Sequence, residues 1–448
     1  MTELTIDQQT AEAQPANMNK FLVIWIGQVI SILGSGLTAF ALGVWIFQKT
    51  GQATPFALTI LFYNLPRILL LPLAGSLADR WNRRLVMILS DVGNALVTLG
   101  AFFLLSFSSL EVWHVYLIAT LGSIFSAFQE PAYMASITML VPQKDLARAN
   151  GMIQMGQAIE MVITPLIAGL LFVSMGLTGI ITIDFFTFLF AVGALLLVQI
   201  PQPVMRDEHK QSGSVLSDAR FSWDYLKARP GLFGLLWYYA MMNFLLNWSG
   251  VLTGPMLLSQ TSPRTLGIVQ MVVGLGMLAG GILSSVWRGP KRRIPAVIGF
   301  IVLALVGMII AGLRPNPFVT GFGFFWLMLF IPLASASSQA VFQSKVAPDV
   351  QGRVFSIRGM ISRSVMPIAY FTAGPLADRV FGPVMNTGGA WANTFLGTLL
   401  DTGPGRGIGL MFVISAVIAI GISALVYANP RIRNLEEELP DALSSTAQ

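Results

Sequence analysis

The chain has 448 residues, of which 54% are hydrophobic and only 11% are charged, and its mean hydropathy is +0.71. Because a soluble domain carries about 25% charged residues, this composition excludes a soluble fold and indicates a polytopic membrane protein. The net charge of +6 does not indicate nucleic-acid binding, since the lysines and arginines lie between apolar runs rather than on one patch. The chain has no cysteine, so disulfides, thiolate metal sites and a cysteine nucleophile are excluded.

The first 20 residues are polar and acidic and lack the basic n-region of a cleaved signal peptide, so the first apolar run should remain as a membrane helix. A spanning helix needs about 18 or more apolar residues, because its backbone groups must be paired within the segment. About twelve runs satisfy this criterion. They cover approximately 21–48, 55–78, 85–106, 113–140, 151–175, 177–200, 232–259, 265–287, 294–313, 317–345, 354–377 and 407–428.

A polar segment divides these runs six and six, and its mixed charges predict a solvated linker that is partly helical. The loop 380–405 should be irregular because it is rich in glycine, asparagine and threonine. The acidic tail after Pro430 should be disordered. The expected organisation is a cytoplasmic N-terminal tail (1–20), a first six-helix bundle (21–200), a cytoplasmic linker (201–230), a second six-helix bundle (231–429) and a cytoplasmic tail (430–448).

Most lysines and arginines fall in the segment before the first apolar run and in the segments that follow the even-numbered runs. By the positive-inside rule these segments are cytoplasmic, so both termini should lie inside. The segments predicted to lie outside hold only Lys49, Arg264, Arg314, Arg379 and Arg406.

The two halves read as distant copies, which is typical of a transporter built from repeats. The fourth run is followed by V-P-Q-K-D-L-A-R at 141–148, and the tenth by V-A-P-D-V-Q-G-R at 346–353. The eighth run ends in G-I-L-S-S-V-W-R-G-P-K-R-R, which echoes G-S-L-A-D-R-W-N-R-R at 75–84, with Ser285 in the position of Asp79.

The stretch 75–84 is the densest functional signal of the chain. Gly75 lets two helices approach closely, Asp79 can pair with a cation or cap a helix start, and the arginines mark one side of the membrane. The stretch resembles the loop between helices two and three of the major facilitator superfamily, G-x-L-A-D-R-x-G-R-K. Asn82 replaces the second glycine of that motif, and because asparagine tolerates a left-handed backbone, the turn should be kept.

Four further motifs are similar to the drug-efflux branch of that superfamily, which includes macrolide exporters. They are W-I-G-Q-V-I-S-I-L-G-S-G at 25–36, R-A-N-G at 148–151, G-R-V-F-S at 352–356 and G-P-L-A-D-R-V-F-G at 374–382. The resemblance implies an all-α major facilitator fold: twelve transmembrane helices form two six-helix bundles with pseudo-two-fold symmetry. The bundles would surround a central cavity and rock between inward-open and outward-open states.

The resemblance also implies that a charge network at 75–84 latches the inward face shut. A positive-inside anchor with a turn is the alternative interpretation. The expected latch residues are Gly75, the acid Asp79, the basic Arg80, Arg83 and Arg84, and Asp91 just inside the third helix.

Helices five and eight would form the interface between the bundles. Helix five carries only part of the antiporter signature G-P-x-x-G-G, as T-P-L-I-A-G at 164–169. Its Pro165 and Gly169 are expected to allow close packing against helix eight. Arg363, near the midplane of the eleventh run, is expected at the bundle interface as well.

Ionisable groups inside spans cost a few kcal/mol each, so they should be paired or face water. Arg67 lies near the midplane of the second run, Glu130 precedes Pro131 in the fourth, and Glu160 lies in the middle of the fifth. We hypothesise that Glu130 and Glu160 are the protonatable pair and are held near Arg67, because a carboxyl group in a low dielectric can exchange protons near neutral pH. The alternative is a set of structural salt bridges that never titrate. Helix four lacks the arginine, and helix one the acid, that many drug/proton antiporters carry there.

Candidate cavity residues lie on helices one and seven, which line the cavity in the superfamily. Trp25 and Gln28 belong to the first run, and Tyr239 and Asn243 to the seventh. Aromatic residues of membrane proteins are more often interfacial or packing residues, which is the competing interpretation.

The sequence therefore predicts a multi-pass protein of the cytoplasmic membrane that exports an amphipathic, drug-like or macrolide-like molecule in exchange for protons. Export of an endogenous metabolite, a siderophore or a lipid is the alternative. We expect a monomer in the lipid bilayer, with no cofactor, no metal and no nucleic-acid partner.

Three other classes fit the sequence poorly. A membrane-embedded enzyme would need a reactive cluster, but the only histidines are His114, predicted outside, and His209, in the linker. A primary pump would need G-x-x-x-x-G-K-[ST], which the linker and tails lack. A passive channel would predict rings of polar residues instead of a duplicated bundle.

Overall fold

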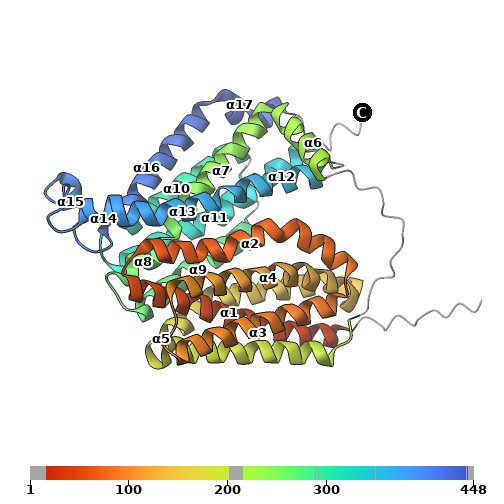
Figure 1. Cartoon of the computed structure of the whole chain (residues 1–448). Coiled ribbons are helices and arrows are strands. Elements are labelled where there is room, and N and C mark those ends of the chain that lie inside the picture. Colours follow the sequence, from red (N-terminus) through yellow and green to blue (C-terminus); the bar gives the residue numbers. More distant parts are fainter. Residues whose placement is uncertain are drawn as a thin grey trace, which may run out of the picture.

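The structure, a computed structural model, describes residues 17–200, 215–287, 289–290, 292–348, 350–439 and 441. All regular elements in these ranges are helices, and they form two bundles that lie side by side (Figure 1). Within the described ranges, nine helices are long and apolar enough to cross a membrane. The chain is therefore an all-α polytopic membrane protein.

The first bundle contains α1 to α5, and the second contains the transmembrane elements from α7 onwards (Figure 1). The first comprises α1 (Met18–Thr50), α2 (Ala53–Arg80), α3 (Arg83–Ser106), α4 (Val112–Leu140), η1 (Gln143–Asp145) and α5 (Leu146–Leu197). The second comprises α7 (Pro230–Gly250), α8 (Thr253–Leu258), α9 (Pro263–Val286), α10 (Arg293–Leu313), α11 (Pro317–Lys345), α12 (Gln351–Ser364), α13 (Met366–Leu376), η2 (Ala377–Phe381) and α16 (Arg406–Ala428). The remaining elements are α6 (Val215–Lys227), α14 (Gly382–Met385), α15 (Phe395–Leu400), α17 (Pro430–Arg433) and α18 (Leu435–Glu438).

The expected count of twelve spans is approximate, because two spans depart from one helix per span. The fifth and sixth spans agree with the prediction: they are two helices within α5 that are separated by a break at Gly176, where φ is 65° and ψ is −168°. The seventh span is divided into α7 and α8, and the eleventh into α12, α13 and the π-helical turn η2. Glycine accounts for the first break, since it adopts positive φ without steric cost.

Several helices begin at a residue whose side chain caps the first turn of the same helix. Asn17 accepts a hydrogen bond from the backbone of Asn19 at the start of α1, and Asn316 does the same for Phe318 at the start of α11. Ser262 accepts from the N–H of Thr265 at the start of α9, where Pro263 occupies the first helical position. These residues satisfy backbone donors that have no partner within the helix.

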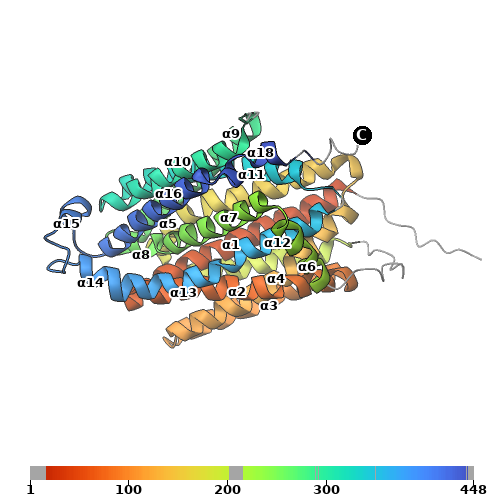
Figure 2. The same cartoon turned by 90° about the horizontal axis from the view of Figure 1, so that it is seen from above.

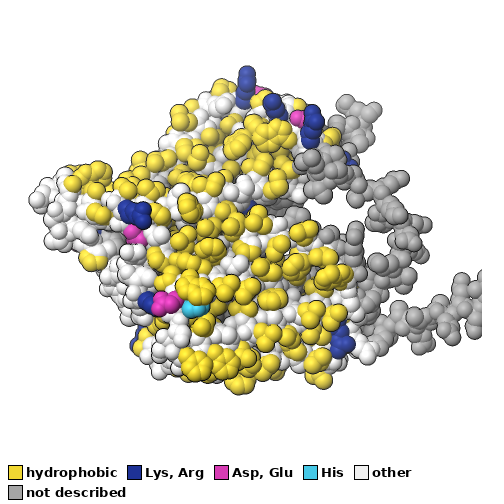
Figure 3. Space-filling view, viewed as in Figure 1, with side chains coloured by type: hydrophobic (Ala, Val, Ile, Leu, Met, Phe, Trp, Pro, Cys, Tyr) yellow, Lys and Arg dark blue, Asp and Glu magenta, His cyan; other side chains and the backbone are white. Residues whose placement is uncertain are grey.

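The helices run between two distinct ends of the molecule (Figures 1 and 2). One end carries the start of α1 together with α6, α17 and α18, and we call it the linker end. The other carries α8, α14 and α15, and we call it the loop end. Charged side chains on the face in Figure 3 lie mainly toward these two ends, with a hydrophobic band between them. This distribution is the one that a bilayer requires.

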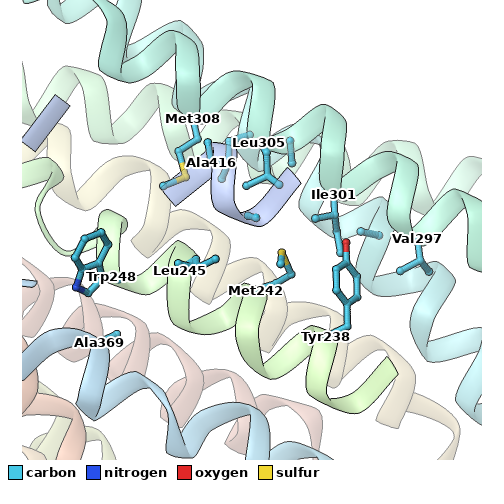
Figure 4. Packing of buried hydrophobic residues seen from close by; sticks show 14 of the residues in the cluster. Tyr238, Met242, Leu245, Trp248, Val297, Ile301, Leu305, Met308, Ala369 and Ala416 are labelled. Carbon is cyan, nitrogen blue, oxygen red and sulfur yellow. The ribbon is translucent and has the colours of Figure 1, made fainter. Parts of the chain in front are cut away.

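The second bundle has a continuous hydrophobic core, in which α16 packs against both α7 and α10 (Figure 4). Two buried hydroxyl pairs cross this core: Tyr238 with Ser423 at 2.9 Å, and Ser249 with Ser415 at 3.0 Å. Ala57 at the start of α2 belongs to the same cluster, so the core continues into the first bundle near the loop end.

The bundles meet where small residues let the backbones approach. A Cβ added to Gly169 of α5 would lie 2.7 Å from the carbonyl oxygen of Pro263, and one added to Gly274 of α9 would lie 2.9 Å from that of Met161. Such contacts run from the loop end to about the middle of the helices. Toward the linker end, α2 and α12 diverge (Figure 1).

Two peripheral segments differ from the sequence prediction. The tail after Pro430 is ordered through Leu439, because the buried Lys345 donates to the carbonyl oxygens of Glu436 and Leu439 and pairs with Asp441 at 3.0 Å. The predicted disorder is therefore wrong for this part: its acidic residues and backbone carbonyls have partners on the second bundle.

The loop 380–405 also contains more structure than expected. It holds the short helices α14 and α15. Arg406 at its end is buried rather than exposed, and donates to the carbonyl oxygens of Leu400 and Gly312, each at 2.7 Å.

The close contact between α5 and α9 gives a first prediction. In Gly267→Ala the new methyl group would meet the carbonyl oxygen of Pro165, a backbone atom that cannot move aside cheaply. We expect a loss of about 1–3 kcal/mol of stability, measured as a lower Tm of the purified protein in detergent. Gly100→Ala is the control, because open space surrounds Gly100, and alanine should add up to about 1 kcal/mol of helix stability there. Equal Tm shifts for the two variants would contradict the packing account.

Candidate functional site

A cavity of about 200 Å³ opens within the first bundle. Its walls come from α1, α2, α3, α4 and both halves of α5. Charged and aromatic side chains share the lining: Trp25, Tyr63, Arg67, Glu130, Tyr133, Glu160 and Phe188. A concave site with an apolar wall and a few convergent polar groups is the default candidate for ligand binding.

The best-defined interaction of the cavity is the ion pair between Arg67 of α2 and Glu130 of α4. The guanidinium Nη2 lies 2.5 Å from the carboxylate Oε2, so the pair is also a charge-assisted hydrogen bond. The side chains are 41% and 43% exposed, so both reach the cavity rather than being sealed in protein. The pair also connects α2 and α4 at positions away from the ends of both helices.

Glu160 of α5 lines the same cavity as the ion pair, but no ion pair or hydrogen bond joins its carboxylate to another described residue. A Cβ on Gly36 of α1 would lie 3.6 Å from its Oε1, so the carboxylate faces α1 across the cavity. The cavity thus contains one compensated acid and one acid without a direct partner among the described residues.

Asp91 of α3 lies beside the cavity in a network of amides. It is fully buried. The Nε2 atom of Gln129 donates to one oxygen of Asp91 at 2.6 Å, and that of Gln28 donates to the other at 3.3 Å. Gln129 also donates to Oε1 of Gln28 at 3.0 Å. The network joins α1, α3 and α4, and the partners of Asp91 are these amides rather than the arginines with which the sequence grouped it.

The four predicted cavity residues divide between the two bundles. Trp25 and Gln28 line the cavity, and the indole N–H of Trp25 donates to the carbonyl of Met152 at 3.0 Å. Tyr239 and Asn243 are on α7: the hydroxyl of Tyr239 donates to the carbonyl of Ala334, and the amide of Asn243 donates back to its own helix. The structure does not bring these two residues to the cavity of the first bundle.

The stretch 75–84 forms the end of α2 and the turn into α3. The surroundings of Gly75 and the side chains of Asp79 and Arg80 lie outside the described part of the structure. Arg83 donates to the carbonyl of Ala135 at 2.7 Å, and Arg84 donates to those of Leu195 and Leu196, each at 2.8 Å. Both arginines therefore bind helix ends of their own bundle.

The expectation for Asn82 is wrong in its mechanism. Its backbone has φ −62° and ψ 108°, which is extended rather than left-handed. Its side chain instead accepts a hydrogen bond from the N–H of Leu85 at 3.1 Å and caps α3. Asparagine suits this position because it is among the best N-cap residues.

The predicted interface residues lie in different surroundings. Pro165 and Gly169 face Pro263 and Gly267 of α9, the helix that corresponds to the eighth span. Arg363 lies in the last turn of α12 and has an exposed side chain, and no hydrogen bond or ion pair connects it to another described residue.

Sequence reasoning missed Gln129 and Phe188 in the lining, and it favoured the aromatic residues of helices one and seven over Tyr63. Gln129 is adjacent to Glu130, and two consecutive polar residues within an apolar run could have indicated that Gln129 lines the cavity. Tyr63 lies one helical turn before Arg67, so its place on the same face followed from helical spacing. No group of three or more His, Asp or Glu residues that could hold a metal occurs in the described part of the chain.

Comparisons with known proteins agree with this architecture. Residues 24–370 match the family model of the Major Facilitator Superfamily. Macrolide efflux protein A of Streptococcus pyogenes is 29% identical over 372 residues, which cover 81% of this chain and 90% of that protein. Multidrug efflux pump Tap of Mycolicibacterium fortuitum is 24% identical over 375 residues, which cover 80% of this chain and 89% of that protein.

Solved transporters share the fold. A bacterial homolog of the human lysosomal transporter Spinster, in an inward-facing and occupied conformation, superimposes with a TM-score of 0.67 at 17% identity, over 92% of this chain and 97% of that one. The nucleoside transporter NupG gives a TM-score of 0.66 at 14% identity, over 92% and 99%. Family and fold are thus those of transporters rather than of enzymes.

The ion pair of the cavity gives a second prediction. Arg67→Gln or Glu130→Gln leaves one charge without its partner, so each should lower the Tm, whereas the double variant should lose less than the sum. We expect a coupling energy of about 0.5–3 kcal/mol from the double-mutant cycle. The exposed pair Lys49–Glu111, at 3.3 Å, is the control and should couple by about 1 kcal/mol or less. Additive effects at Arg67 and Glu130 would contradict the pairing.

Proposed function

Because the chain belongs to the Major Facilitator Superfamily, we propose that it exports an amphipathic small molecule across the cytoplasmic membrane by alternating access, in exchange for protons. The observation that carries the proposal is the cavity of the first bundle, where aromatic rings and three charged side chains from the inner parts of membrane-spanning helices meet. Charges inside membrane spans are costly unless they serve a polar pathway. The relatives named for macrolide and multidrug efflux support export as the direction.

The charges of the lining favour a cationic amphipathic cargo. The lining holds two acids, Glu130 and Glu160, and one base, Arg67. Since Arg67 pairs with Glu130, the carboxylate of Glu160 is left to attract a positive group. The rings of Trp25, Tyr63 and Phe188 supply flat apolar surface for the rest of the molecule.

The same carboxylate can couple cargo to protons. A carboxyl group that binds either a proton or a cationic cargo, but not both, makes the two ligands compete. Proton entry from the outside would then release cargo there, and cargo binding from the cytoplasm would release the proton. Glu130 would take part through its bond to Arg67, because protonation of Glu130 weakens the ion pair and frees α2 from α4.

Orientation follows from the distribution of basic residues. We assign the linker end to the cytoplasm, since the predicted inner segments carry most of the lysines and arginines. The bundles meet toward the loop end and diverge toward the linker end (Figure 1). On this assignment the bundles are in contact toward the outside and their helices diverge toward the cytoplasm (Figure 1). Asp79 with Arg80, Arg83 and Arg84 would close the linker end in the opposite state.

Transport by purified protein in proteoliposomes tests the proposal. A labelled macrolide or a fluorescent cation should accumulate in inside-out vesicles only when protons flow in the opposite direction. Accumulation that does not depend on the gradient would contradict antiport. If neither probe moves with or without a gradient, the assignment to amphipathic drug-like cargo is wrong, and an endogenous metabolite is favoured.

The carboxylate of Glu160 gives a more specific prediction. Glu160→Gln should reduce gradient-driven accumulation at least tenfold and should weaken binding of a cationic probe more than that of a neutral one. Asp224→Asn is the control, because Asp224 is exposed on α6 and lies outside the cavity. If Glu160→Gln and Glu130→Gln both retain gradient-driven transport, neither residue carries the coupling.

A further inference from the structure

The start of α2 is capped by an acid from the other bundle. Asp378 of η2 accepts hydrogen bonds from the N–H of Ala53 at 2.9 Å, from the N–H of Thr54 at 2.7 Å and from the hydroxyl of Thr54 at 2.6 Å. The local N-cap, Gln52, makes no capping hydrogen bond with its side chain. Asp378 therefore satisfies donors that the neighbouring chain leaves open, and its charge complements the positive end of the helix dipole.

This contact is built into the packing of α2 against α13. One turn before Asp378, Gly374 lies so close to the backbone of Thr54 that an added Cβ would clash with its Cα. Gly374 and Asp378 are four residues apart and share one helical face. The glycine lets the two helices approach, and the aspartate then reaches the first turn of α2.

The sequence carries this Gly-to-Asp arrangement twice. G-S-L-A-D-R at 75–80 ends α2, and G-P-L-A-D-R at 374–379 spans the end of α13 and the start of η2. Because α2 and α13 pack against each other, the two copies lie on neighbouring helices of opposite bundles. The first copy is at the linker end and the second is at the loop end. The duplicated motif thus marks both ends of one helix pair.

No positively charged side chain among the described residues pairs with the carboxylate of Asp378. No ion pair connects it to a described residue, and its neighbour Arg379 has an exposed side chain. The carboxylate is partly buried and is held only by the start of α2. Hydrogen bonds to a charged acceptor are among the stronger ones in proteins.

We propose that Asp378 is a gating residue that latches the loop end shut, and that its three bonds to α2 must break each time the bundles open at that end. The proposal rests on alternating access, as proposed above for this chain. Asp378 is not part of the cavity; it positions the bundles by holding α2 against α13. It sets the population of the loop-closed state and thereby the rate at which cargo can leave.

The test uses the absence of native cysteine. Ala57, one turn after Ala53, is fully buried between the bundles, so a cysteine placed there reacts with a maleimide only when the loop end opens. On the Ala57→Cys background, Asp378→Asn removes the negative charge and one of the two accepting oxygens. It should raise the labelling rate of the purified protein about 5- to 30-fold, because the loss of a hydrogen bond to a charged acceptor shifts an equilibrium by about that factor.

Glu111→Gln is the matched control. Glu111 also lies at a helix start at the loop end, but its ion pair with Lys49 stays within the first bundle. Its loss should leave the labelling rate unchanged. An unchanged rate in Asp378→Asn, or an equal rise in both variants, would overturn the latch.

Thr54 supplies a second pair of variants in case Asp378→Asn folds poorly. Thr54→Val removes the hydroxyl donor at nearly constant volume, whereas Thr54→Ser keeps it. We expect faster labelling for valine and a rate close to the parent's for serine. Equal rates for both would count against the proposal.

The same data separate the latch from the transport cycle. If cargo or a proton gradient changes the labelling of Ala57→Cys but Asp378→Asn does not, alternating access stands and the latch is wrong. If the cysteine is never labelled in any variant or condition, both alternating access and the latch fail. Faster labelling in Asp378→Asn with unchanged labelling in Glu111→Gln supports both.

Discussion

A charged side chain inside a bilayer must be paired or must reach water, and the first bundle is arranged around this constraint. Arg67 and Glu130 pair across α2 and α4 at 2.5 Å, and both remain partly exposed to the cavity. Asp91 is fully buried and is held by two glutamine amides instead. Only Glu160 faces the cavity without a direct partner among the described residues, which is why it is the centre of the proposed cargo and proton exchange.

The contacts between the bundles place this cavity in one state of the proposed cycle. Glycines and prolines let α5 approach α9 and let α13 approach α2, so the bundles close against each other toward the loop end. In the proposed cycle this contact would form and separate repeatedly, and small residues suit it because they let backbones approach with few interlocked side chains. Asp378 adds directional hydrogen bonds to this contact, whereas the side chains of Asp79 and Arg80, proposed to close the linker end, lie outside the described part of the structure.

The sequence predicted the architecture well because hydrophobic length and charge placement determine membrane topology. Helix starts at Pro263 and Pro317 agree with the predicted spans within a few residues, and the break at Gly176 lies at the predicted boundary between the fifth and sixth spans. Breaks inside spans, such as the one between α7 and α8, could not be read from hydropathy. The sequence predicted that Glu130 and Glu160 lie near Arg67, but it did not distinguish which of the two carboxylates pairs with the arginine. The amide partners of Asp91 were not foreseen, because the rotation of each helix about its axis is set by tertiary packing. Asn82 was correctly assigned to the turn between α2 and α3, but its backbone is extended rather than left-handed.

The central claim is that protons and cargo exchange through the carboxylates of the first bundle. The most direct measurement is the proton movement that cargo itself drives, followed with a pH-sensitive dye trapped inside proteoliposomes that start without any gradient. The account predicts that a cargo gradient moves protons in the opposite direction, and that Glu160→Gln abolishes this movement while cargo still binds. Cargo flux without proton movement in the parent protein would contradict the account.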